Sequence, residues 1–172
     1  MYKIAILGCE NTHANSFLRQ IYKKGRHPDI EVIGIYSEEE EPARKLHEEF
    51  GVPVMKNYDE LVGKVDGIMV TARHGDNHYK YAKPYLSSGI PMFIDKPVTL
   101  SGEEAVAFMR EARDCGVRIC GSSVGKFLNG VDSTQGLRPR HRRESNPERP
   151  PRNSPGDWPF LKTCSATALI SM

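Results

Sequence analysis

The sequence has 172 residues, enough for one domain with its own hydrophobic core and an additional segment. Because 24 Lys and Arg residues nearly balance 22 Asp and Glu residues, the net charge of +2 gives no reason to expect nucleic-acid binding. No apolar run reaches the about 20 residues that cross a bilayer, and the N-terminus lacks the pattern of a signal peptide. We expect a cytoplasmic protein without a membrane or nucleic-acid partner, and its oligomeric state stays open.

Strand and helix patterns alternate from Tyr2 to about residue 123. Apolar runs without polar alternation predict strands, and each run before the last is followed by apolar residues at helical spacing. Strands buried on both faces, joined by helices, predict an α/β fold with a doubly wound parallel sheet. The predicted strands are residues 2–7, 31–36, 66–72, 90–94 and 117–120, and the predicted helices are 16–24, 42–50, 78–89 and 101–116.

Several residues predict how these helices begin and end. Pro42 suits a first helical turn, and Gly51 suits a C-terminal cap. Pro84 is expected to bend or shorten its helix. In the last helix Ser101 and Glu104 form a capping-box pattern. The face that this helix turns to the core is predicted to carry Ala105, Phe108, Met109 and Ala112.

From residue 124 onward the sequence changes character. Six of the 12 prolines lie here, and eight basic residues outnumber four acidic ones. Such a segment buries too little apolar surface to order itself, so we expect a domain over residues 1–123 and a disordered Arg/Pro-rich tail over residues 124–172. The basic run at residues 138–143 lacks interleaved aromatic residues and is interpreted as solvated chain.

Four cysteines are spread along the chain, at positions 9, 115, 120 and 164. None forms a C-x-x-C pair, so neither a zinc ribbon nor a thioredoxin-like motif is indicated. We interpret them as reduced structural thiols. For Cys9 the alternative of a reactive thiol stays open, because it lies close to a predicted helix start.

In doubly wound sheets, ligands bind beyond the carboxyl ends of the strands. The first loop there has Gly8 for a tight turn, but Glu10 and His13 stand where two further glycines are expected. Asn11 or Thr12 can cap the helix that follows, whose free N–H groups favour an anion. Because Glu10 brings a negative charge towards a phosphate site, Glu10→Gly is expected to strengthen NADH binding.

The second loop begins with Ser37, where an acidic residue usually binds the ribose 2′-hydroxyl. Ser37 can hydrogen-bond a ribose or a phosphate, and the acidic run 38–41 repels a 2′-phosphate. The alternative is a turn into a solvated, acidic helix end.

The third loop carries His74, Asp76 and His78 at alternating positions. Imidazole and carboxylate groups suit zinc or iron, and His13 is the candidate for a further ligand. The alternative is that His78 caps or begins the next helix, and we do not expect a metal site here.

In the fourth loop Lys96 follows a buried strand, between Asp95 and Pro97. Because Pro97 stops the strand, Lys96 is held at the edge where ligands bind, and a lysine there can polarise a hydroxyl or assist proton transfer. The alternative is a surface ion pair between Asp95 and Lys96.

Taken together, residues 2–123 resemble the Gfo/Idh/MocA family of oxidoreductases. Asp95-Lys96-Pro97 is similar to the Glu-Lys-Pro motif of that family, and His78 matches the histidine that ends its Pro-Asn-x-x-His loop. The resemblance implies a Rossmann fold that binds NAD or NADP, with Lys96 as the catalytic or substrate-orienting residue. It also implies that the residues lining the cofactor are Gly8, Asn11, Thr12, His13, Ser37, Ala72, Arg73, His74, His78, Asp95 and Pro97.

The sequence departs from the family pattern in its reduced glycine loop, in Ser37 and in Arg73, so the preference between NAD and NADP is open. Family members carry a second α/β domain, and the resemblance ends where that domain begins. We therefore expect a truncated chain, with a shifted reading frame after about Ser123, that binds nucleotide but does not turn over a sugar or polyol. Two alternatives are a non-catalytic nucleotide-sensing module and a metal-dependent hydrolase using His74, Asp76 and His78.

Overall fold

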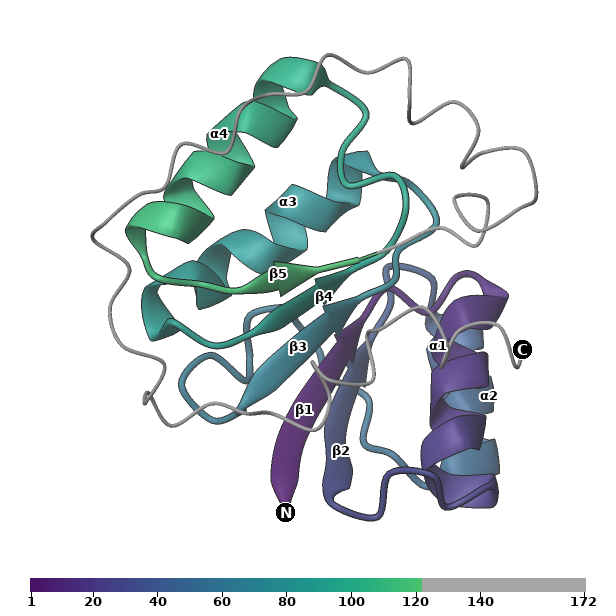
Figure 1. Cartoon of the computed structure of the whole chain (residues 1–172). Coiled ribbons are helices and arrows are strands. Elements are labelled where there is room, and N and C mark those ends of the chain that lie inside the picture. The colour runs from purple at the N-terminus through teal and green to yellow at the C-terminus, as the bar shows by residue number, and fades with distance from the viewer. Residues whose placement is uncertain (122–172) are drawn as a thin grey trace, which may run out of the picture. The chain divides into compact units, whose positions relative to one another are not determined.

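The computed structural model describes residues 1–121, which form a parallel sheet with helices on both faces (Figure 1). The predicted tail and the boundary before it lie outside the described residues. Five strands follow the order β2-β1-β3-β4-β5. They are β1 (Tyr2–Leu7), β2 (Ile30–Tyr36), β3 (Gly67–Val70), β4 (Met92–Ile94) and β5 (Ile119–Cys120). All four pairings between neighbouring strands are parallel, as the sequence predicted.

Four α-helices connect these strands, and two of them continue in a different helical form. They are α1 (Thr12–Leu18), α2 (Glu40–Phe50), α3 (Asp76–Ala82) and α4 (Gly102–Asp114). A π-helical turn, Arg19–Lys23, extends α1, and a 3₁₀ helix, Lys83–Ser88, extends α3. The change in α3 occurs next to Pro84, whose ring cannot fit inside a regular α-helix, so the predicted interruption is confirmed.

The helices divide between the two faces of the sheet, α1 and α2 on one side and α3 and α4 on the other (Figure 1). An isolated parallel bridge between Ile35 and Val54 explains this division. It places the chain after α2 beside the outer edge of β2, so α2 covers the same face as α1 by a right-handed crossover. The chain then returns to β3 on the other side of β1. The carboxyl ends of β1 and β3 therefore flank the topological switch point, where doubly wound folds bind ligands.

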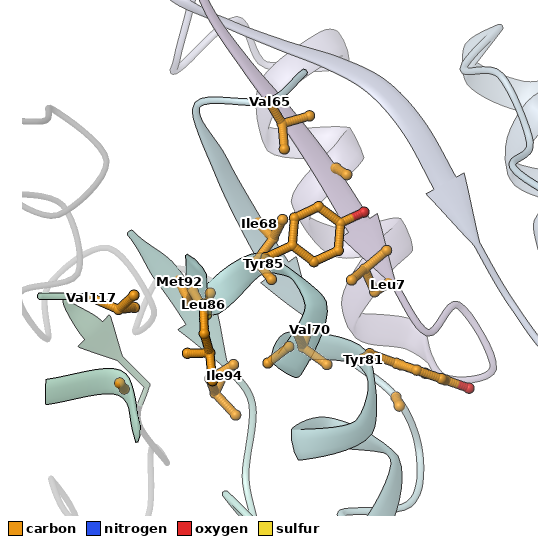
Figure 2. Close-up of a cluster of buried hydrophobic side chains, with 14 of the residues drawn as sticks. Leu7, Val65, Ile68, Val70, Tyr81, Tyr85, Leu86, Met92, Ile94 and Val117 are labelled. Carbon is orange, nitrogen blue, oxygen red and sulfur yellow. The ribbon is translucent and has the colours of Figure 1, made fainter. Parts of the chain in front are cut away.

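The core forms because the strands carry apolar side chains on both faces. Every residue of β3 and β4 is buried, and so are residues 4–7 of β1. Figure 2 shows the face under α3, where Leu7, Ile68 and Val70 from the strands surround the ring of Tyr85. Burying one such side chain stabilises the fold by about 1.5–3 kcal/mol, so this cluster fixes α3 and its loop against the sheet.

Most of the local helix signals are confirmed, and one prediction is wrong. Gly51 ends α2 with a φ of 72°, and the Ser101 hydroxyl accepts a hydrogen bond from the Glu104 amide at 3.4 Å. Phe108 and Ala112 of α4 are buried as expected, but Met109 is 48% exposed. Only a narrow stripe of α4 reaches the sheet, because the helix lies at the outer edge beside the short strands β4 and β5.

Candidate functional site

Four loops meet at the carboxyl edge of the sheet, as the strand order predicted. They follow β1, β2, β3 and β4, and hydrogen bonds join the first loop to each of the other three. A further bond joins the third loop to the fourth. Since these contacts link residues up to 82 positions apart, the candidate site is a single assembled surface.

Gly8 sits at the centre of this surface because no other residue fits there. Its φ is +90°, and a Cβ placed on it would lie 2.3 Å from the Cα atom of Ala72. The Gly8 amide donates to the carbonyl of Tyr36 at 2.8 Å, which continues the pairing of β1 with β2. Gly8 therefore allows the loops after β1 and β3 to touch, in addition to making the turn.

Asn11 holds the turn after Gly8 in two ways. Its side-chain oxygen accepts the His13 amide at 2.8 Å, so Asn11 is the cap of α1, and its side-chain nitrogen donates to the carbonyl of Thr71 at 2.6 Å. The Thr71 hydroxyl in turn donates to the carbonyl of Gly8 at 2.5 Å. Sequence reasoning missed Thr71, although a hydroxyl at the end of an apolar strand was a usable signal. Thr12 is exposed and is the first residue of α1.

Asp95 is a buried carboxylate, 4% exposed, that ties the fourth loop to the first. One of its oxygens accepts the backbone amide of Lys96 at 2.8 Å, and the other accepts from Nδ1 of His13. The predicted alternative of an Asp95–Lys96 ion pair is wrong, because the Asp95 carboxylate pairs with His13 and with the backbone amide of Lys96, not with its ammonium group. Within residues 1–121 the exposed Lys96 ammonium has no ion-pair partner. The peptide bond between Lys96 and Pro97 is cis.

His78 is fully buried and joins the third and fourth loops. Its ring nitrogens lie 2.6 Å from the carbonyl of Pro97 and 3.0 Å from the carbonyl of Ala72. A neutral imidazole donates to one of them, and an imidazolium to both. In either form both ring nitrogens face protein carbonyl groups. His78 is the third residue of α3.

The other residues of the third loop do not gather around His78. His74 and Asp76 are exposed, and the carbonyl of His74 accepts the Asn77 amide at 3.1 Å. Among residues 1–121 no three His, Cys, Asp or Glu side chains are placed to hold a metal ion. This arrangement contradicts the hypothesis of a metal-dependent hydrolase built on His74, Asp76 and His78, because the three side chains share no common point.

The carboxylate of Glu10 turns towards the end of β2. One oxygen accepts the Ser37 hydroxyl at 2.9 Å and the Glu38 amide at 3.3 Å, and the other oxygen is buried without a donor within the described residues. The negative charge of Glu10 therefore lies at the end of β2, whereas the sequence predicted it beside a phosphate in the turn after β1. Nearby, Arg73 donates to the Glu10 carbonyl and lies 3.5 Å from Glu39.

Cys9 has its thiol inside the protein, between Gly8 and Glu10. Burial, with a smaller contribution from the Glu10 charge, raises the pKa of this thiol to about 12. Because the thiolate is the reactive form, the alternative of a reactive Cys9 is contradicted, and the residue serves as a small apolar side chain.

No helix among residues 1–121 has the length and apolar character to span a membrane.

Comparison with known proteins identifies the fold. The model of an oxidoreductase family with an NAD-binding Rossmann fold, Gfo/Idh/MocA, matches residues 2–122. No curated protein matches the sequence. Among solved structures, UDP-N-acetylglucosamine 3-dehydrogenase GnnA from Acidithiobacillus ferrooxidans aligns with a TM-score of 0.61 and 20% identity, over 79% of this chain and 41% of that one.

Two further structures align equally well. The WlbA dehydrogenase from Bordetella pertussis, solved with NADH and UDP-GlcNAcA, gives a TM-score of 0.64 at 14% identity, over 79% of this chain and 41% of that one. Biliverdin reductase from Synechocystis, solved with biliverdin and NADP+, gives 0.64 at 15% identity, over 78% and 42%. At these identities the likeness establishes the fold. The chain spans about two fifths of the length of these proteins.

Proposed function

Because the chain belongs to the Gfo/Idh/MocA oxidoreductase family, we propose that residues 1–121 form the cofactor-binding part of a dehydrogenase acting on a sugar or polyol. The observation that carries this proposal is the meeting of four loops at the switch point, with the Lys96 ammonium exposed beside them. The family binds NAD(P) in its Rossmann fold, and the residues present at the switch point fit such a cofactor.

The fit rests on two features of the loops. Gly8 lets the first and third loops approach closely, so a dinucleotide can lie across both of them. The buried oxygen of Glu10 without a donor is a polar group suited to a hydroxyl of the ligand. In this arrangement the turn formed by residues 8–13 would hold the pyrophosphate, and Ser37 and Arg73 would lie towards the adenosine. The third and fourth loops, through residues 72–74, His78 and residues 95–97, would lie towards the nicotinamide.

When bound, the nicotinamide supplies the chemistry of hydride transfer to or from a carbon atom. The role of Lys96 is to donate a hydrogen bond to the oxygen on that carbon and to move its proton. The buried Asp95 carboxylate holds the Lys96 backbone and the His13 ring, so both keep fixed positions relative to β4. His78 fixes Pro97 on the other side of Lys96. The hydrogen bonds of Asp95 and His78 thus fix the backbone on both sides of Lys96, whose amine is exposed.

The sugar or polyol class follows from family membership and from the two nucleotide-sugar dehydrogenases among the solved structures. Within residues 1–121, Lys96 is the exposed ionisable side chain that we assign to the reacting end.

Titration of the full chain with NADH and NADPH, followed by cofactor fluorescence, tests the proposal. We expect saturable binding of at least one of them, and Lys96→Ala should keep most of that affinity because Lys96 faces the substrate. Lys64→Ala, which removes an exposed lysine just before the amino end of β3, is the control for lost charge. Absence of binding at millimolar concentration would contradict the proposal.

A further inference from the structure

We propose that Glu10 is the acid that binds the adenosine ribose, and that through it the chain selects NADH over NADPH. This inference rests on the proposed cofactor site. It assigns a role to a residue that stands in the β1 loop, where a glycine is expected, and it reverses the effect expected from the sequence for removing the Glu10 side chain.

The position of the Glu10 carboxylate supports this role. In dinucleotide-binding folds an acid at the end of β2 accepts the ribose 2′-hydroxyl, and here Ser37 stands at that point without a charge. Glu10 reaches the same point from the neighbouring strand, because its Oε1 atom accepts the Ser37 hydroxyl at 2.9 Å and the Glu38 amide at 3.3 Å. The two residues together restore a carboxylate at the end of β2.

The second oxygen of the same carboxylate provides the binding group. Oε2 of Glu10 is buried and has no donor within residues 1–121. A buried carboxylate oxygen left without a donor is costly, so a ligand that brings a hydroxyl there gains a charge-assisted hydrogen bond. The ribose 2′-hydroxyl is such a donor. A 2′-phosphate is not, because it carries negative charge and acceptor oxygens.

The charges around this point disfavour a phosphate further. Glu38 and Glu39 follow Ser37, and both side chains are exposed beside the Glu10 carboxylate. Arg73 is the cation nearest in the third loop, but it already donates to the Glu10 carbonyl and pairs with Glu39. Lys80 is likewise paired with Glu38 at 2.8 Å. The basic side chains that could receive a 2′-phosphate are therefore engaged with the acids that repel it.

The experiment measures dissociation constants of the full chain for NADH, NADPH and NADH lacking the adenosine 2′-hydroxyl. For the natural sequence we expect NADPH and the 2′-deoxy compound to bind about tenfold more weakly than NADH, or worse, which is the loss of one hydrogen bond to a charged group. Equal affinity for all three ligands overturns the inference and leaves the proposed function standing. Binding of none of them overturns both.

Variants separate Glu10 from its surroundings. Glu10→Gln should weaken NADH binding about tenfold and leave the dissociation constant of the 2′-deoxy compound unchanged. The dissociation constants for NADPH and NADH should then become nearly equal. Glu48→Gln is the matched control, because it removes one negative charge from an exposed ion pair on α2. A Glu10→Gln protein that binds NADH more tightly than the natural sequence overturns the inference. The ligand comparison on the natural sequence holds even where a variant fails to fold.

Discussion

Three buried polar side chains hold the loops together on the β3–β4 side of the carboxyl edge, whereas on the β1–β2 side the acidic side chains Glu38 and Glu39 are exposed. Thr71, His78 and Asp95 are each surrounded by protein and bonded to backbone groups. Glu38 and Glu39 on the other side form ion pairs at the surface. Buried hydrogen bonds are costly to break and surface ion pairs contribute little. We therefore expect the first side to set the stability of the site and, if the proposed function holds, the second to adjust which ligand it prefers.

Gly8 lies where the two sides join, and changing it should have the largest effect. Gly8→Ala forces a side chain to within 2.3 Å of the Ala72 backbone and also strains a φ of +90°. We expect a loss of about 3 kcal/mol or more in the free energy of unfolding, measured by urea denaturation.

Gly63→Ala is the control for this measurement, because Gly63 has a φ of +73° and nothing within 4 Å of the added Cβ. Its loss should be about 1 kcal/mol, from backbone strain alone. Similar losses for the two variants would mean that the close approach of the first and third loops contributes no stability.

His78 tests the buried side by itself. His78→Ala leaves the carbonyls of Ala72 and Pro97 without their donor and opens a cavity at a fully buried position. We expect a loss of about 2–4 kcal/mol in the same denaturation assay. His74→Ala, at an exposed position of the same loop, should change stability by less than about 0.5 kcal/mol. Equal effects would contradict the division between a buried and an exposed side.

The sequence was sufficient to predict the strands and the edge where the loops meet, because both follow from apolar runs and strand order. It was insufficient for the contacts that join the loops. Glu10 and Ser37 are 27 positions apart, and His13 and Asp95 are 82 apart, so neither pair has a local signal. The apolar spacing of the first helix begins only near Phe17, and the start of α1 followed from its cap, Asn11, which was one of the two predicted candidates.

The exposed side should show the smallest effect, as a dependence on pH. The hydrogen bond from Lys80 holds the pKa of the Glu38 carboxyl below its ordinary value. A lowered pKa means that this pair stabilises the fold above the unfolded pKa and that the contribution is lost as the pH falls through the folded one. Since both side chains are largely exposed, we expect less than about 0.5 kcal/mol.

Comparison of the natural sequence with Lys80→Met between pH 6 and pH 3 isolates this contribution. The stability difference should shrink as the pH falls. A remainder that does not depend on pH would report the contact of the Lys80 ammonium with the Tyr58 and Tyr81 rings. A difference that grows towards pH 3 would contradict the assigned sign.

Hydrogen–deuterium exchange of the full chain, with and without saturating NADH, tests most directly whether the four loops form one cofactor site. We predict slower exchange on NADH addition in all four loops, at residues 9–13, 37–39, 72–75 and 95–96, and no change in α4, which lies at the outer edge of the sheet. Slower exchange confined to α4, or no change in any of the four loops while NADH is bound, would contradict the account.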